Sequence, residues 1–82
     1  MKLYLYQGKC NLSGIRIRER RIELQLSQEQ LAAKLQLLGL EMNQKAISRI
    51  EAGLRVVPDY EVMMFARALD VTVPWLMQME TE

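Results

Sequence analysis

Histidine is absent from the 82-residue chain, and Cys10 is its only cysteine. Within one chain, these shortages exclude a disulfide framework, a zinc site of cysteine and histidine, and a nucleophile activated by histidine. No motif flanks Cys10, so we interpret it as an unreactive free thiol. A glycine-rich phosphate loop is also missing. An enzyme is therefore the least favoured class of function, and no metal or cofactor is predicted.

Long apolar runs are missing as well. The longest are only a few residues, far short of the roughly 20 that cross a bilayer, and the N-terminus lacks the apolar core of a signal peptide. We therefore expect a cytoplasmic protein with no membrane partner. A chain of 82 residues is near the lower size limit for one hydrophobic core. We expect one domain, with no room for a separate catalytic or ligand-sensing domain and no evident small-molecule ligand.

The formal net charge is only +1, but the charge is unevenly distributed along the chain. Through Val57 there are ten basic residues and five acidic ones, which gives +5. From Pro58 onward Arg67 is the only base against five acids, which gives −4. Such a division is typical of a module that faces phosphate with one side.

Five helices are predicted from repeated start and stop signals, near residues 13–24, 28–38, 44–52, 60–69 and 73–79. Ser27, Asn43 and Thr72 are each suitable N-caps. Each is flanked by an apolar residue before the cap and another four residues into the helix, the pattern of a hydrophobic staple. Gly39 and Gly53 are natural C-caps for the second and third helices. The fold class predicted from these signals is a compact all-α domain.

Residues 1–10 favour extended structure and end near a glycine, so they are predicted to form a short extended N-terminal arm. Two roles are open to this arm. It could contact the backbone of a nucleic acid through its basic residues, or it could pack against the core or a second subunit. The second role is favoured.

The predicted helix over residues 44–52 has a polar face and an apolar face. On a helical wheel Ala46, Ile47, Ile50 and Glu51 lie on one side, and Gln44, Lys45, Ser48 and Arg49 lie on the other with Ala52. Glutamine can pair with an adenine edge, lysine and arginine with guanine, and serine with either bases or phosphate. The competing interpretation is a merely solvated helix face.

Residues outside this helix strengthen the interpretation as a DNA-reading surface. Gln28 lies in the first turn of the preceding helix, where backbone N–H groups and the helix dipole favour a phosphate. Arg55, in the loop after Gly53, could add a phosphate contact or could simply be solvated. Arg21 and Glu51 both lie on inward faces of their helices, so we predict that they form a partly buried ion pair.

The segment from Ile17 to Leu76 resembles the phage-repressor and Cro type of helix-turn-helix regulators, also called the xenobiotic-response-element family. Four separated stretches carry the resemblance, in the order expected: Arg18-Glu19-Arg20-Arg21, Leu26-Ser27-Gln28-Glu29-Gln30-Leu31-Ala32, Ala46-Ile47-Ser48-Arg49-Ile50-Glu51-Ala52-Gly53 and Leu69-Asp70-Val71-Thr72-Val73-Pro74-Trp75-Leu76.

This resemblance implies a five-helix, lambda-repressor-like domain that binds double-stranded operator DNA, with its third helix in the major groove. Base-reading positions of the family fall on Gln44, Lys45 and Arg49, with Asn43 and Ser48 alongside. Asn43 is expected on the phosphate side with Gln28. The structural arginine–glutamate pair of the family falls on Arg21 and Glu51.

The resemblance also implies a homodimer on a palindromic operator and a role as a transcriptional repressor. Trp75, Met77 and Met79 are the candidate dimer contacts, although core packing is the favoured interpretation of Trp75. The alternative function from another class is a protein-interaction module, such as an antitoxin, whose main partner is a protein.

Two features depart from the family pattern. The span from Ser27 to Ile47 is longer than the compact pattern requires, so the second helix, its connection to the third, or both are lengthened. Gln25 stands where the family usually has glycine, so the turn between the first two helices could differ.

Overall fold

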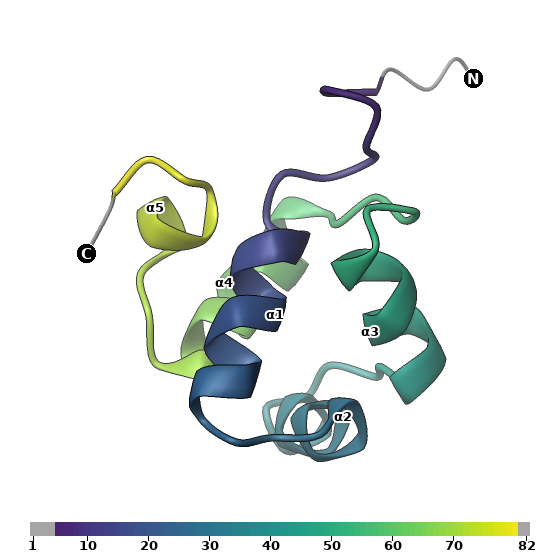
Figure 1. Ribbon diagram of the computed structural model, residues 1–82. Helices are drawn as coiled ribbons and strands as arrows, with labels where there is room; N and C mark the ends of the chain where they lie inside the picture. Colours follow the sequence, from purple (N-terminus) through teal and green to yellow (C-terminus); the bar gives the residue numbers. More distant parts are fainter. Residues whose placement is uncertain (1–4, 81–82) are drawn as a thin grey trace.

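The computed structural model describes residues 5–80 and contains five helices in this part of the chain. They are α1 (Gly14–Glu23), α2 (Gln28–Leu37), α3 (Gln44–Glu51), α4 (Asp59–Leu69) and α5 (Val73–Leu76). In Figure 1, α1 lies in front of α4, α2 crosses below them, and α3 and α5 stand on opposite sides. The predicted all-α, five-helix fold is confirmed. None of the described helices is long and apolar enough to cross a membrane.

The starts of three helices are determined by the predicted caps. The Ser27 hydroxyl accepts a hydrogen bond from the Gln30 backbone N–H (2.9 Å), and the Gln30 side chain accepts one from the Ser27 N–H (2.8 Å). This reciprocal pair is a capping box. The Asn43 Oδ1 and Thr72 Oγ1 atoms cap α3 and α5 in the same way, by accepting from the backbone three residues on. Local sequence therefore defines where α2, α3 and α5 begin.

Left-handed backbone conformations end several helices. Gln25 has φ +59° in the turn between α1 and α2, and Asp70 has φ +56° at the end of α4. Gln25 thus adopts the conformation for which the related family uses glycine, at the steric cost of a Cβ atom. The prediction that the last helix continues to Met79 is wrong. It ends at Leu76, because Gln78 has φ +60° and the Met79 N–H turns back to the Pro74 carbonyl (2.8 Å).

The connection from α2 to α3 occupies residues 38–43, so part of the long span from Ser27 to Ile47 is a non-helical connection. Gly39 turns the chain with φ +95°. The Gln36 side chain then donates to the Met42 carbonyl (3.1 Å), and the Met42 side chain is buried in the core. The connection is therefore attached to the domain before α3 begins.

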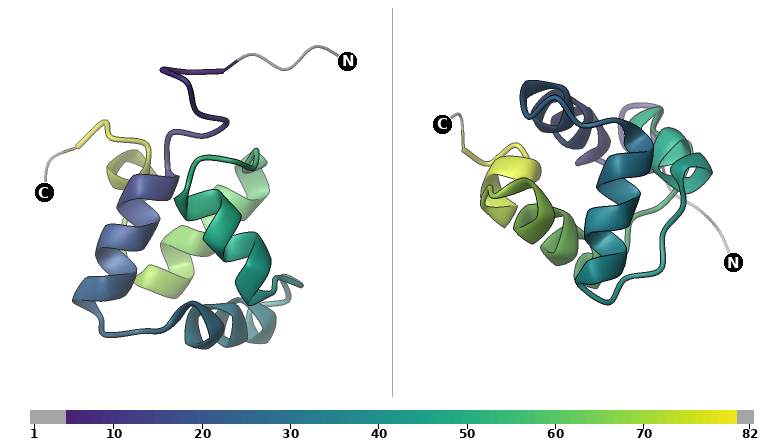
Figure 2. Two further views of the ribbon diagram at one scale, coloured as in Figure 1. Left: turned by 45° about the vertical axis from the view of Figure 1, so that its right-hand side comes forward. Right: turned by 90° about the horizontal axis from the view of Figure 1, so that it is seen from below.

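All five helices contribute side chains to one core. Figure 2 shows the helices arranged around a common centre. Burial of a large apolar side chain contributes about 1.5–3 kcal/mol to the free energy of unfolding. The fully buried members are Ile17, Leu31, Leu35, Ile47, Ile50, Phe65, Leu69 and Leu76. Helix α1 approaches α3 so closely that a Cβ atom on Gly14 would collide with the Ile50 carbonyl oxygen. Glycine is therefore required at that crossing.

The described part of the predicted arm, residues 5–10, contains a tight turn rather than a simple extended chain. Gln7 and Gly8 both have positive φ, and the backbones of Tyr6 and Lys9 exchange two hydrogen bonds (2.8 and 3.0 Å). Two central residues with positive φ define the type I′ turn of tight hairpins. Residues 1–4 of the predicted arm lie outside the described part.

Candidate nucleic-acid interface

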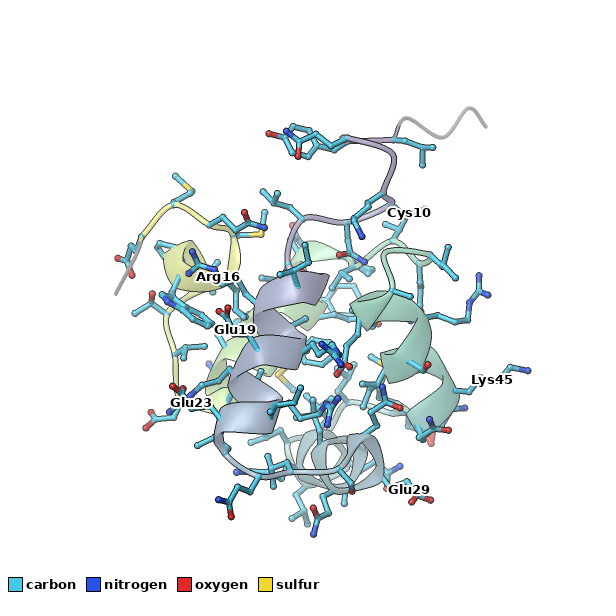
Figure 3. The ribbon with its side chains drawn as sticks, viewed as in Figure 1. Cys10, Arg16, Glu19, Glu23, Glu29 and Lys45 are labelled. Atoms are coloured by element: carbon cyan, nitrogen blue, oxygen red, sulfur yellow. The ribbon has the colours of Figure 1, made fainter. Side chains whose placement is uncertain are left out.

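Helix α3 has one buried face and one open face. Ile47 and Ile50 are fully buried, and Glu51 is 8% exposed. On the opposite face Gln44, Lys45, Ser48 and Arg49 are all exposed. Figure 3 shows Lys45 pointing away from the body of the molecule. The structure therefore brings the four predicted base-reading side chains together on an open surface.

A chain of hydrogen bonds connects this open face to the interior. The Gln44 Nε2 atom donates to Gln28 Oε1 (2.6 Å), and Gln28 Nε2 donates to Glu51 Oε1 (3.1 Å). Gln28 comes from the first turn of α2, as the sequence indicated. The first turns of α2 and α3 are thus linked through two amide side chains. Gln28 therefore orients the Gln44 side chain, and Gln28 is itself held by its hydrogen bond to the buried Glu51 carboxylate.

Arg21 completes this network by pairing with the same carboxylate. Its Nε and Nη2 atoms donate to the two carboxylate oxygens of Glu51 (2.7 and 3.0 Å), and its Nη1 atom donates to the Leu26 carbonyl (2.8 Å). The Arg21 side chain is 12% exposed and that of Glu51 is 4% exposed. The hydrogen bonds to Glu51 raise the pKa of Arg21 above its ordinary value. This bidentate pair fixes α3 against α1.

Arg55 is also held by an ion pair, with a partner that sequence reasoning missed. Its Nη1 and Nη2 atoms donate to the two carboxylate oxygens of Glu61 (2.7 and 3.3 Å), and these hydrogen bonds raise the pKa of Arg55. Glu61 is 5% exposed. A signal for this burial exists in the sequence, because Glu61 stands four residues before Phe65 on the core face of α4. Arg55 remains a predicted phosphate contact, but most of its donors are occupied.

The remaining predicted phosphate residue, Asn43, is exposed at the start of α3. Its Oδ1 atom accepts from the Ala46 N–H (2.8 Å), which orients the side chain at the helix N-terminus. Near the other end of the helix, Arg49 Nη2 donates to the Leu54 carbonyl (3.2 Å). Among the described residues, neither Lys45 nor Arg49 forms an ion pair. Both cations are therefore free to meet an anionic ligand.

The three candidate dimer contacts have different environments. Trp75 is partly buried, and the Arg16 guanidinium lies over its ring, 4.6 Å from the centroid. Met77 is partly buried against the core, whereas Met79 is 78% exposed. Met79 is accordingly the most accessible of the three, and Ile15 and Val73 are further exposed apolar side chains on the elements around it.

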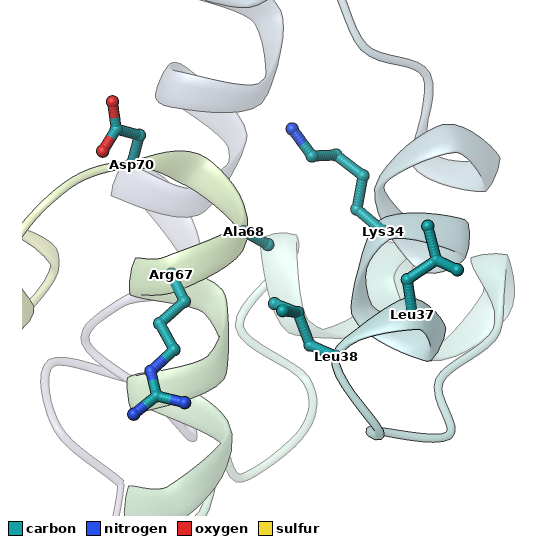
Figure 4. Close-up of a pocket in the computed structure, with 6 residues that line it drawn as sticks. All are labelled: Lys34, Leu37, Leu38, Arg67, Ala68 and Asp70. Carbon is teal, nitrogen blue, oxygen red and sulfur yellow. The ribbon is translucent and has the colours of Figure 1, made fainter.

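A separate groove of about 330 Å³ lies between the C-terminal parts of α2 and α4 (Figure 4). None of the exposed polar residues of α3 lines it. Leu38 and Ala68 face each other across it, and Lys34, Leu37, Arg67 and Asp70 surround it. Within residues 5–80, no group of three or more acidic or cysteine side chains is arranged to hold a metal ion.

Comparison with known families agrees with this geometry. The family model for Cro/C1-type helix-turn-helix domains matches residues 17–76, which is most of the chain. The chain therefore belongs to this helix-turn-helix family, and it is a DNA-binding regulator of that class. A search of curated proteins finds no significant match.

Proposed function

We propose that this protein is a sequence-specific transcriptional regulator that binds double-stranded operator DNA and represses transcription by occupying it. The observation that carries the proposal is the two-faced α3. Ile47 and Ile50 are fully buried, while Gln44, Lys45, Ser48 and Arg49 are exposed together. A rigid helix with such side chains on one face can enter a major groove and read base edges.

Each polar residue has a distinct role in this proposal. Gln44 presents a donor and an acceptor to an adenine edge, and Lys45 and Arg49 donate to guanine. Ser48 reads bases or binds phosphate from the same face. Gln28 and Asn43, at the first turns of α2 and α3, bind the DNA backbone and set the position of the reading helix. A cytoplasmic location, as predicted from the sequence, accompanies this function.

The test is selection of bound duplexes from a random library, followed by binding measurements with variants. We expect one enriched motif and a steep decrease of affinity with salt. Arg49→Ala and Gln44→Ala should each reduce the free energy of DNA binding by about 1–3 kcal/mol. Each should also relax the sequence specificity at the one base pair that the side chain contacts. Lys34→Ala, which removes an exposed cation from the α2–α4 groove, is the matched control and should leave specificity unchanged.

Absence of any enriched motif, or affinity that does not respond to salt, would contradict the proposal. Those outcomes would favour the alternative of a module whose main partner is a protein. The variants must keep the unfolding free energy of the unmodified protein, so that lost binding reports on the surface and not on folding.

The proposal includes a homodimer on a palindromic operator. One small module makes few phosphate contacts, so two modules on adjacent half-sites reach useful affinity more readily. Exposed Met79, together with Ile15 and Val73, supplies apolar surface for this contact. We expect a two-to-one complex of protein and duplex by mass measurement, and a Met79→Asp variant that binds DNA more weakly without loss of stability. A complex that stays one-to-one on a palindromic site would rule out the dimer.

A further inference from the structure

Lys9 and Cys10, which follow the tight turn at Gln7 and Gly8, contact the backbone just beyond the C-terminal end of α3. The Cys10 N–H donates to the Gly53 carbonyl (2.8 Å), immediately after α3 ends. The aliphatic stem of Lys9 covers Gly53 so closely that a Cβ atom there would lie 2.9 Å from both Cγ and Cδ of Lys9. Gly53 also has φ +77°, which favours glycine. The arm and α3 therefore meet along the length of the Lys9 side chain.

Asn11 attaches the base of the arm to the same place. Its Nδ2 atom donates to the carbonyls of Ile50 (2.9 Å) and Arg55 (2.8 Å), and its Oδ1 atom accepts from the Gly14 N–H (2.8 Å). Carbonyls at the end of a helix lack partners within the helix. Asn11 satisfies one of these and fixes the following loop at the same time. Asn11 thus binds the backbone both before Gly53, at Ile50, and after it, at Arg55. These two hydrogen bonds fix the position of the neighbouring Lys9 relative to α3.

Lys9 extends the positive charge of the reading face beyond the helix. Lys45 and Arg49 are about one helical turn apart on α3, and Gly53, under the stem of Lys9, follows two residues after the helix ends. The Arg49 guanidinium rests on the Leu54 carbonyl, in the turn that Lys9 covers. Lys9 is exposed, and no carboxylate among residues 5–80 forms an ion pair with it. Lys9 therefore adds a third exposed cation without an ion pair, held just beyond the C-terminal end of the helix that carries Lys45 and Arg49.

We propose that Lys9 binds a backbone phosphate of the same duplex, beside the major groove that α3 enters. This inference rests on the proposed function, and it assigns to the arm a role as a second DNA contact that is independent of base sequence. A helix lying in the major groove has phosphates at its ends, where a cation held rigidly beyond the helix can reach them. Lys9 is such a cation, because its stem is already packed and its ammonium group is left to the solvent.

The experiment compares Lys9→Gln with Lys9→Arg and with Lys34→Gln, by measuring affinity for the selected operator and for a scrambled duplex over a range of salt. Glutamine keeps part of the aliphatic stem and removes the charge. We expect Lys9→Gln to reduce the slope of log affinity against log salt by about 0.9, and affinity near 0.1 M salt by roughly five- to ten-fold. The loss should be the same for both duplexes. Lys9→Arg should keep the slope, and Lys34→Gln should not change it.

An unchanged slope and affinity in Lys9→Gln would overturn the inference while leaving the proposed function intact. A loss confined to one base pair of the operator would also overturn it, because phosphate contacts do not distinguish bases. So would a change of oligomeric state in Lys9→Gln, which would place the arm at a subunit contact. An unmodified protein that fails to bind any duplex selectively would overturn the proposed function and this inference together.

Discussion

Two arginine–glutamate pairs of similar geometry occur in this domain, and they connect very different parts of it. Arg21 and Glu51 are 30 residues apart and join α1 to α3. Arg55 and Glu61 are six residues apart and join a loop to the first turn of α4. Both pairs are bidentate, with shortest nitrogen–oxygen distances of 2.7 Å. The difference lies in their surroundings.

Among the described residues, the carboxylate of Glu51 accepts hydrogen bonds from two side chains, and that of Glu61 accepts from one. Glu51 accepts from Gln28 as well as Arg21, and Arg21 donates further to the Leu26 carbonyl. Among the described residues, Glu61 has only Arg55 as a side-chain partner, and the Arg55 side chain is 32% exposed. The first pair is part of a network that ends on the reading face at Gln44. The second pair engages the Arg55 guanidinium with a buried carboxylate, while part of the Arg55 side chain stays exposed.

Breaking the inner pair should have the largest effect. We expect Arg21→Met to lower the free energy of unfolding by about 3–5 kcal/mol, because it leaves the Glu51 carboxylate buried without its cation. Glu51→Leu should lower the free energy of unfolding by less than Arg21→Met does. The Arg21 side chain that it leaves without a partner is more exposed than the Glu51 side chain, so it reaches solvent more easily. The double variant should be more stable than additivity of the two single variants predicts. Urea denaturation measures all three.

The control for this cycle is Arg18→Met, an exposed arginine on α1, which should change stability by less than about 0.5 kcal/mol. Additive effects of Arg21→Met and Glu51→Leu would show that the pair is not directly coupled. Because the pKa of Arg21 is raised, its positive charge persists at every pH below its folded-state value. The stability that the charged Arg21 contributes is therefore lost only as the pH rises through its raised, strongly alkaline pKa.

Breaking the outer pair should have a smaller effect. Arg55→Met is expected to lower the free energy of unfolding by about 1–2 kcal/mol, since solvent screens a partly exposed arginine. Because its guanidinium is occupied by Glu61, we expect the salt slope of DNA binding to change little. Arg67→Met, an exposed arginine on α4, is the matched control. A fall in slope near 0.9 in Arg55→Met would instead establish the phosphate contact predicted from the sequence.

The smallest effect on stability is expected for the residue that distinguishes the two networks. Gln28→Ala removes the second donor to Glu51 and should lower the free energy of unfolding by only about 0.5–1.5 kcal/mol. DNA affinity should fall by more than this, because the proposed backbone contact of Gln28 is lost and Gln44 loses the partner that orients it. Equal small losses in stability and in binding would show that the link from the interior to the reading face has no functional consequence. Thermal or urea unfolding and operator titration provide the two measurements.

Much of this architecture could be predicted from local patterns. The caps Ser27, Asn43 and Thr72 act within three residues of themselves, so their effect does not depend on the rest of the fold. The two faces of α3 follow from helical periodicity once the helix is recognised. Such features include the number of helices, the start of each capped helix and the exposure of the four polar residues on α3.

The missed features each depend on a single contact or a single backbone conformation, whether it lies nearby in the sequence or far away. The partner of Arg55 could be predicted only with the knowledge that Glu61 is buried on α4. The early end of α5 could be predicted only with the knowledge that the chain turns back at Gln78. The seating of the arm on Gly53 joins residues more than 40 positions apart. The end of α5 and the seating of the arm leave no periodic pattern, because each involves a single backbone conformation or hydrogen bond. Only the burial of Glu61 has a periodic signal, in its spacing of four residues from Phe65.

The amino-acid sequence by itself determined where the helices begin, which of their faces are apolar, and which polar side chains α3 presents. These are short-range properties of backbone hydrogen bonding and of apolar spacing. Only the tertiary structure decided which cations stay available to a ligand and which are taken by a buried carboxylate. That choice depends on desolvation and on distances of a few ångströms between segments that the chain order does not bring together.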